Sequence, residues 1–295
     1  GNEPKDQVKS DYEQWLEDDQ LELFDVLQKR KINREAAEAR HKDLKIKRPL
    51  SIYLGESNLS RTEISPNGRY IVYTTISRPK IRQTLVPNFV TESGYTTAPG
   101  YREKVGNPQE SYATAIYDRQ LDTFYNLKIE EIPGIYDKPK FILDKNKENN
   151  DFNVKYEVPR AVIIHGPKFS SDGLSAVVDI KSMDNKDRWL MSLDVETGEL
   201  SLLDRQHDDA WVGGPGVVAW NMVAGNSGWI SATDWYWYHS EADGYSQLYK
   251  VNVKTKEKVQ LTKGKFEVTD ANLSKDGKFF YLTSSEVDPG ERHFY

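Results

Sequence analysis

One short phrase recurs three times along this chain and constrains its fold more than any other feature. The phrase starts with Ser, continues to Asp or Asn followed by Gly, and begins at Ser65, Ser170 and Ser274. Such a turn joins two strands tightly, because the Asp or Asn side chain caps it and the Gly adopts a positive φ. β-Branched and aromatic residues follow each copy, which predicts a strand after each turn.

A second pattern lies downstream of these turns and predicts hairpins. Residues 189–203 turn at 196–198, residues 247–262 turn at 254–256, and residues 115–127 form a looser copy. Repeats of roughly 40 to 50 residues with four short antiparallel strands are typical of propeller blades. The sequence therefore predicts an all-β fold, a partial β-propeller of four-stranded antiparallel blades.

The patterns divide the chain into four units, at residues 59–129, 160–204, 217–264 and 267–295, or about three and a half blades. The third unit lacks the Asp-Gly pair, and its turn is expected at residues 224–229. A closed propeller needs at least about four blades and usually six to eight. We therefore expect residues 49–295 to be a truncated propeller. The alternative to truncation is that a partner or a second copy of the chain covers the open sheet edges.

The first 48 residues have a different pattern and predict a helix. Apolar residues stand among many charges, Ser10 or Asp11 can cap the start, and Pro49 ends the segment. A solvated helix explains the charges, and a helix that docks on a second domain is the alternative. Two long loops are expected in the propeller region, at residues 80–111 and 129–159.

The composition argues against several functional classes. A net charge of −6 and the lack of a basic patch argue against a nucleic-acid partner. The chain has no Cys, which excludes disulfides and thiol chemistry, and no apolar run near the roughly 20 residues needed to cross a membrane. The first residue is Gly1 and not Met, so we expect that a signal peptide was removed and that the location is periplasmic or secreted.

Motifs for catalysis and metal binding are missing from the sequence. It has no Gly-x-Ser-x-Gly nucleophile elbow, no Walker loop, no His-Glu-x-x-His and no Cys metal set, so no catalytic residue, metal or cofactor is expected. The five His residues are expected at surfaces or strand ends, with His207-Asp208-Asp209 in a solvated loop. The adjacent carboxylates of Glu130 and Glu131 are a candidate grip for a substrate's amino terminus, and an exposed strand end is the simpler interpretation.

Longer stretches in the later units resemble a known family. They lie at residues 205–214, 240–249, 260–264, 267–268 and 284–295. The motif residues in them are Trp211, Gly213, Gly214, Asp243, Gly244, Tyr245, Pro289, Gly290, Glu291 and Arg292. Their order and spacing resemble the N-terminal propeller of dipeptidyl peptidase IV-like enzymes, which are serine peptidases of the prolyl oligopeptidase family. The resemblance is weaker but consistent over residues 59–204.

The resemblance implies a two-part serine peptidase. In such a protein the propeller gates or shapes the access of peptide substrates to a C-terminal α/β-hydrolase domain, which carries the catalytic Ser, Asp and His and is absent from this chain. The dipeptidyl peptidase branch binds the substrate's amino terminus through two glutamates in a Trp-x-Tyr-Glu-Glu context. Residues 233–237 lack those carboxylates and Glu130-Glu131 lacks the aromatic lead, so dipeptidyl, endopeptidase and acylaminoacyl specificities remain open.

Other interpretations of the same residues stay open. The turns at residues 243–245 and 288–291 are interpreted as marks of blade geometry in preference to substrate contacts. A free-standing propeller that binds a protein or a ligand is the main alternative to a peptidase domain. A propeller glycosidase, which needs paired acidic residues facing one cavity, ranks third.

Overall fold

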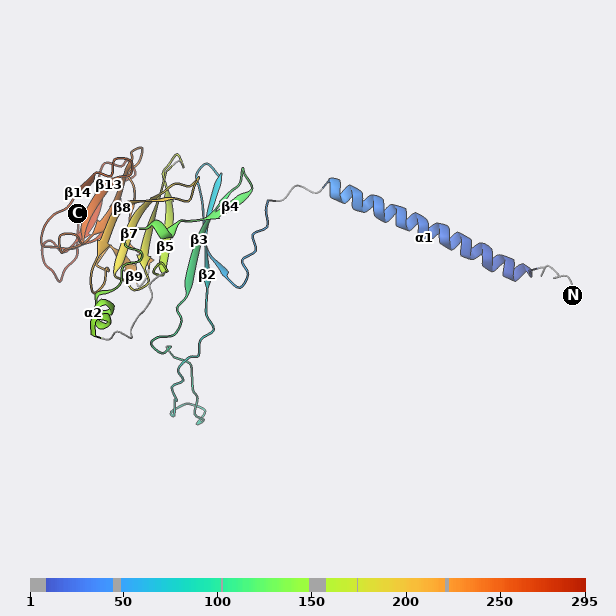
Figure 1. Ribbon diagram of the computed structural model, residues 1–295, viewed down its shortest axis with the longest axis horizontal. Coiled ribbons are helices and arrows are strands. Elements are labelled where there is room, and N and C mark those ends of the chain that lie inside the picture. Colours follow the sequence, from blue (N-terminus) through green and yellow to red (C-terminus); the bar gives the residue numbers. More distant parts are fainter. Residues whose placement is uncertain (1–8, 45–48, 102, 149–157, 174, 221–222) are drawn as a thin grey trace. The chain divides into compact units, whose positions relative to one another are not determined.

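The structure is a computed structural model that describes residues 9–44, 49–101, 103–148, 158–173, 175–220 and 223–295 (Figure 1). The chain divides into two compact units, Gly1–Pro49 and Leu50–Tyr295. The first unit is helical, and the second is built mainly of β-sheets. Across the described ranges, no helix combines the length and the apolar character that a membrane span requires.

The helical unit contains α1 (Asp11–Asp43), a helix of 33 residues. Ser10 caps it, because the Ser10 hydroxyl accepts a hydrogen bond from the Glu13 N–H while the Glu13 carboxylate accepts one from the Ser10 N–H. The predicted helix and its start at Ser10 are confirmed, although the helix ends at Asp43, before Pro49. Every residue of α1 is exposed.

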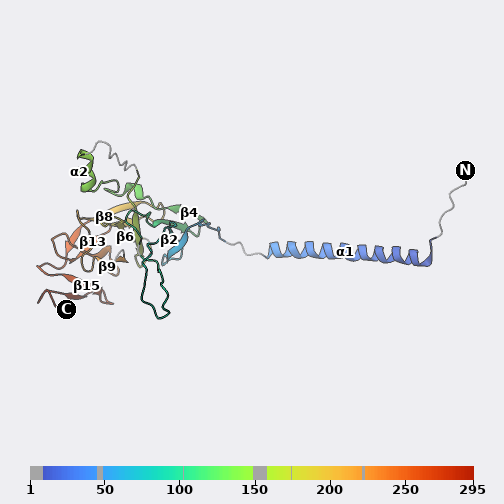
Figure 2. The same cartoon turned by 90° about the horizontal axis from the view of Figure 1, so that it is seen from below.

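The second unit contains antiparallel sheets in which the strands follow the order of the chain (Figures 1 and 2). The first sheet is β1 (Asn58–Ile64), β2 (Tyr70–Ser77), β3 (Ser111–Asp118) and β4 (Thr123–Asn126). The second is β5 (Val162–Phe169), β6 (Ala176–Ser182), β7 (Asp187–Leu193) and β8 (Leu200–His207). The third is β11 (Gly228–Trp229), β12 (Trp235–Ser240), β13 (Gln247–Asn252) and β14 (Lys258–Gln260), and the fourth is β15 (Val268–Leu273), β16 (Phe280–Ser284) and β17 (His293–Phe294). The predicted partial propeller of four-stranded antiparallel sheets is confirmed.

The segments between these sheets hold smaller elements. A two-stranded ribbon of β9 (Val218–Trp220) and β10 (Val223–Ala224) precedes the third sheet, which therefore starts later than predicted. The expected loop at 129–159 contains the 3-10 helix η1 (Ile129–Glu131) and the helix α2 (Lys140–Glu148), while residues 149–157 lie outside the described residues. The expected loop at 80–111 forms an extended ribbon with bridges Leu85–Gly100 and Asn88–Thr97, which projects beyond β2 and β3 in Figure 1.

The three repeated turns share one hydrogen-bond pattern. The Ser65 hydroxyl accepts from the Tyr70 N–H at 2.9 Å and donates to Asn67 Oδ1 at 2.7 Å. The serines of the other two turns make the same pair of bonds. The glycine of each turn has a φ between 68° and 70°, as the sequence predicts.

The turn of the third sheet was predicted at residues 224–229, and that placement is wrong. The turn lies between β11 and β12, where the Ile230 N–H donates to the Trp235 carbonyl at 2.9 Å and the Thr233 N–H donates to the Ile230 carbonyl at 3.2 Å. Ala232 takes the left-handed conformation there, with a φ of 56°. A left-handed non-glycine residue costs only about 1–2 kcal/mol, so packing can impose this turn without an Asp-Gly signal.

Apolar layers lie between consecutive sheets. Every residue of β6 is buried, because successive side chains of a strand point to opposite faces and β6 has a sheet on each side. Val178 belongs to the layer shared with the first sheet, and Val177 belongs to the layer shared with the third. Trp237 and Leu248 pack against Ala271 between the third and fourth sheets. This face-to-face stacking is the packing of propeller blades.

Candidate functional site around Asp187

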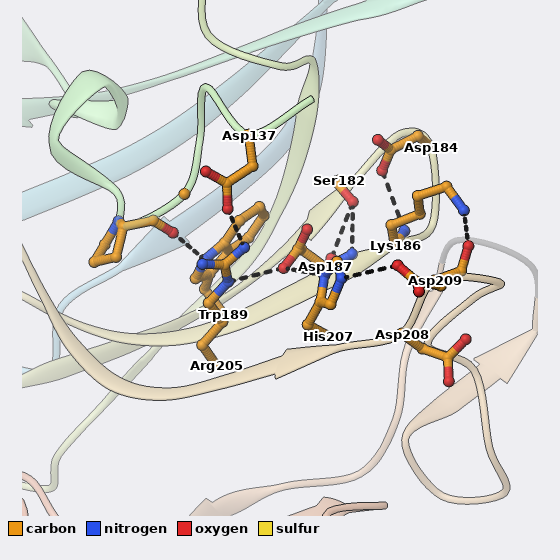
Figure 3. Close-up of polar contacts among 12 residues, drawn as sticks. Asp137, Ser182, Asp184, Lys186, Asp187, Trp189, Arg205, His207, Asp208 and Asp209 are labelled. Carbon is orange, nitrogen blue, oxygen red and sulfur yellow. Dashed lines mark hydrogen bonds and ion pairs between the residues drawn. The ribbon is translucent and has the colours of Figure 1, made fainter. Parts of the chain in front are cut away.

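Polar side chains of the second sheet converge on the carboxylate of Asp187 (Figure 3). Asp187 opens β7 and pairs in register with His207 at the end of β8. Its fully buried carboxylate contacts Arg160 Nη2 at 2.7 Å, Arg205 Nε at 2.8 Å and His207 Nδ1 at 3.0 Å. Charge-assisted hydrogen bonds of this kind offset the desolvation of a buried carboxylate.

The turn between β6 and β7 holds Asp187 in place. The Asp187 N–H donates to the Ser182 hydroxyl at 2.9 Å, and Asp184 in the same turn contacts Arg160 Nη1 at 3.2 Å. Burial works to raise the pKa of Asp184, but hydrogen bonds from Ser182 and the Lys186 N–H, together with the charge of Arg160, outweigh burial and lower the pKa. The turn therefore favours the ionised form of Asp184.

The same cluster clamps the segment that follows η1. Trp189 Nε1 donates to the Pro133 carbonyl at 2.9 Å, Arg160 Nη2 to the Gly134 carbonyl at 2.9 Å, and Arg205 Nη2 to Asp137 at 2.7 Å. The guanidinium carbons of the two arginines lie 5.4 and 5.9 Å from the centroid of the Trp189 ring, close enough for cation–π attraction. Residues 133–137 are thus fixed on the second sheet.

A cavity of about 520 Å³ lies beside this clamp. Its lining consists of Asp137, Lys138, Leu143, Arg205 and His207. Burial disfavours the charge of Arg205, but hydrogen bonds to two carboxylates outweigh burial and raise its pKa. The lining presents both signs of charge and can bind a polar or zwitterionic ligand. No three His, Cys, Asp or Glu side chains in the described ranges are grouped so that they could hold a metal ion.

Glu130 and Glu131 lie on η1, immediately before the clamped segment, and both are exposed. Neither residue lines the cavity beside Arg205. The clamp fixes the main chain at Pro133, two residues after Glu131. It therefore restrains the position of η1, which carries both carboxylates. Their role in binding an amino terminus stays a prediction.

A second cavity, of about 460 Å³, lies where edge strands of neighbouring sheets meet. Its lining comes from β1, from β5 and from residues 223–225, and includes Arg61, Glu63 and Lys168. β1 and β5 are the first strands of their sheets and lie at their edges. Lys168 Nζ donates to the Ser227 carbonyl at 2.5 Å, and burial lowers the pKa of Lys168. The first strands thus form a common charged edge, which we call the inner edge.

The motif residues singled out in the sequence lie in turns and connections. The Gly214 N–H donates to the Glu241 carboxylate at 3.2 Å, and the Gly244 N–H donates to the Glu241 carbonyl at 2.9 Å. Arg292 Nη1 donates to the Pro289 and Glu291 carbonyls at 3.1 and 3.0 Å. Trp211 is 72% exposed. These contacts agree with the interpretation of the turns as marks of blade geometry, which stays a prediction.

The predicted position at a surface or strand end is wrong for His165 and His239. His239 is fully buried within β12 and His165 is buried within β5, because both strands are covered by neighbouring sheets. The solvated loop expected at 207–209 holds for Asp208 and Asp209, which are exposed beyond β8. His207 ends β8, and its side chain is 49% exposed and pairs with the buried Asp187.

The register of β7 and β8 shifts between Leu190 and Met191, and this irregularity places Asp187 opposite His207. A regular extension of the 189–203 hairpin places Gln206 there, so the sequence pattern did not reveal the pair.

Comparisons with known proteins agree with this architecture. The model of the family described as "Dipeptidyl peptidase IV (DPP IV) N-terminal region" matches residues 140–295. No curated protein matches the chain. Among solved structures, the chain is similar to the dipeptidyl peptidase 4 of Porphyromonas gingivalis, with 13% identity and a TM-score of 0.53 over 79% of this chain and 28% of that one. It is also similar to a protein provisionally assigned as a dipeptidyl aminopeptidase IV, from Bacteroides ovatus ATCC 8483, with 16% identity and a TM-score of 0.49 over 76% of this chain and 29% of that one.

At these identities, the similarity to the Porphyromonas structure concerns the fold alone, and the chain spans less than a third of the length of either solved protein. The family match rests on the sequence and covers more than half of the 295 residues, including the second, third and fourth sheets. This chain belongs to the family of the dipeptidyl peptidase IV N-terminal region.

Proposed function

We propose that this chain is the non-catalytic propeller region of a dipeptidyl peptidase IV-like serine peptidase and that it shapes the access of peptides to a hydrolase domain outside this chain. The observation that carries the proposal is the inner edge, where first strands of neighbouring sheets share one charged cavity. In a propeller the blades surround a central channel, and such a channel admits an extended peptide while it excludes a folded protein. Sieving of this kind needs no catalytic group from the blades.

The clamp around Asp187 supports a second part of the proposal, that Glu130 and Glu131 hold the amino terminus of the peptide. Two adjacent carboxylates attract an ammonium group, and a fixed loop positions them at a lower entropic cost than a mobile one. The proposal also includes the organisation expected from the sequence, with residues 1–48 as a helical segment and 49–295 as part of the propeller, and a periplasmic or secreted location.

The test uses the full polypeptide that contains this chain. A fluorophosphonate probe is expected to label the full protein and not residues 1–295 alone, because this sequence has no nucleophile elbow. A panel of free and N-acylated peptides of increasing length then defines the substrate class. If the full protein neither reacts with the probe nor cleaves any peptide, the peptidase proposal fails and a binding propeller replaces it.

Variants of the full protein separate the two parts of the proposal. Glu130→Gln with Glu131→Gln is expected to lower kcat/KM about tenfold or more for peptides with a free amino terminus and to leave N-acylated peptides unchanged. Arg61→Gln with Glu63→Gln at the inner edge is expected to change the dependence on peptide length for both kinds of substrate. Equal losses on free and acylated peptides in the glutamate variant would contradict the amino-terminus role.

A further inference from the structure

Helix α1 has two halves of opposite charge. Residues 11–28 hold seven carboxylates and no Lys or Arg, whereas residues 29–43 hold six Lys and Arg and three carboxylates. The helix dipole explains only the ends, with Asp11 and Glu13 in the first turn and Arg40 and Lys42 in the last, because its effect fades within one turn. The helix dipole therefore does not explain the separation of charge in the middle turns of α1.

Most of the large apolar side chains of the acidic half lie on one side, with Asp19 among them and with Leu21 and Phe24 elsewhere on the helix. The apolar side chains of that side recur at spacings of three, four and seven residues, which places them together. They are Tyr12, Trp15, Leu16, Leu23, Val26 and Leu27. Their exposed fractions are 37–66%. We call this set the apolar stripe, and its exposure marks an interaction surface.

Contacts within α1 do little to hold it together. Its described residues form one i,i+4 ion pair, in which Arg34 Nε lies 3.9 Å from Glu38, and both side chains are exposed. Such a pair contributes only about 0.3–0.5 kcal/mol. Helices in proteins obtain most of their stability from packing of an apolar face, so α1 needs a partner along its length.

We propose that α1 pairs antiparallel with α1 of a second copy of this chain. In an antiparallel pair, the acidic half of each copy lies beside the basic half of the other. In a parallel pair, the seven carboxylates of one acidic half would lie beside the seven of the other and repel them. The apolar stripe of each copy then lies against the Lys and Arg side chains of its partner, whose aliphatic stems cover apolar surface while the charges reach water. Trp15 gains a cationic neighbour in the same arrangement. The partner is thus a second copy, chosen by charge complementarity.

A charge-swap experiment on the complete chain tests the partner. One variant replaces Glu17, Asp18, Asp19, Glu22 and Asp25 by Lys, and the other replaces Lys29, Arg30, Lys31 and Arg34 by Glu. Lys and Glu have similar helix propensities, so circular dichroism of each variant serves as the folding control. Sedimentation should show a salt-sensitive dimer for the native chain and dimerisation weakened about tenfold or more for each variant alone. An equimolar mixture of the two should restore the dimer.

Cross-linking tests the orientation, and the chain suits it because it has no Cys. Residues 13 and 42 lie about 44 Å apart along the helix at 1.5 Å per residue, too far for a short linker within one copy. When Glu13→Cys and Lys42→Cys chains are mixed and treated with a short bis-maleimide, an antiparallel pair links one variant to the other. Links only between identical variants, a monomeric native chain, or a charge-swap variant that dimerises as the native chain does would each overturn the proposal.

Discussion

The second sheet and helix α1 contain similar kinds of residue, but the sheet buries them and the helix exposes them. Both combine many charges with large apolar side chains, yet the sheet buries Asp187, Arg188 and Trp189, whereas α1 exposes every residue it has. In the sheet, Arg188 is fully buried and contacts Asp179 at 2.6 Å. Local composition therefore does not decide burial.

Neighbours on both faces make the difference. The second sheet lies between the first and the third, and its polar groups find partners on each side. Arg188 Nη1 donates to the His239 carbonyl of the third sheet at 2.7 Å, and Arg160 Nη2 donates to the Gly134 carbonyl of the clamp at 2.9 Å. The described residues of the helical unit form no such layers, so the side chains of α1 stay exposed within this chain.

The largest expected effect is the loss of a buried charge partner. Asp187→Ala leaves Arg160 and Arg205 without their shared carboxylate, and removing one partner of a buried ion pair costs about 3–5 kcal/mol. Urea unfolding of the sheet unit measures the change. Asp25→Ala in α1 is the matched control and is expected to shift that transition by less than about 0.5 kcal/mol. Equal effects of the two substitutions would erase the contrast between sheet and helix.

Apolar truncation tests the same contrast without charges. Ile180 is fully buried in β6, so Ile180→Ala is expected to destabilise the sheet unit by about 2–5 kcal/mol through lost burial and a cavity. Leu23 in α1 is 57% exposed, and Leu23→Ala should leave the unfolding transition of the sheets unchanged. A loss below about 1 kcal/mol for the buried residue would mean that the layers between sheets repack easily.

Acid should destabilise the third sheet through His239. Burial, and then the charge of Arg188, lower the pKa of His239 to about 4, although Asp270 opposes them. In the unfolded chain His239 takes up a proton as the pH falls below about 6.5, whereas in the folded chain it does so only near pH 4. The free energy of unfolding therefore falls between about pH 6.5 and 4, by up to roughly 3 kcal/mol. His239→Gln should reduce this slope when urea unfolding is repeated across that range. An unchanged slope would assign the acid sensitivity to other groups.

The smallest expected effect concerns the turn that the sequence did not reveal. Ala232 has a positive φ, which a side chain disfavours, so Ala232→Gly is expected to stabilise the sheet unit by up to about 1 kcal/mol after the entropy cost of Gly. Gly173→Ala in the second sheet is the converse and should destabilise, since Gly173 has a φ of 70°. Thermal unfolding of both variants compares the two turns, and a destabilising Ala232→Gly would show that the left-handed backbone carries no strain there.

Much of the architecture followed from local patterns in the sequence. The three Ser-x-Asp/Asn-Gly turns, the hairpins after them and the helix start at Ser10 were predicted correctly, because each depends on contacts between residues a few positions apart. The turn of the third sheet, between β11 and β12, was misplaced because its left-handed residue is Ala232, and an alanine does not mark a turn in the sequence. Motifs in residues 205–295 also identified the family.

The candidate site could not be predicted in the same way. Arg160, Asp187 and Arg205 are separated by 27 and 18 residues and meet only when the strands are in register and the segment after η1 folds back on the sheet. The burial of His239 likewise requires the third sheet to be covered on both faces.

The sequence alone therefore determined the three Ser-x-Asp/Asn-Gly turns, the strand order and the family, because short-range hydrogen bonds and side-chain periodicity specify them. Only the tertiary structure decided which charges are buried around Asp187 and which first strands share the inner edge. Burial depends on what packs against both faces of a strand, and that arrangement joins residues far apart in the chain.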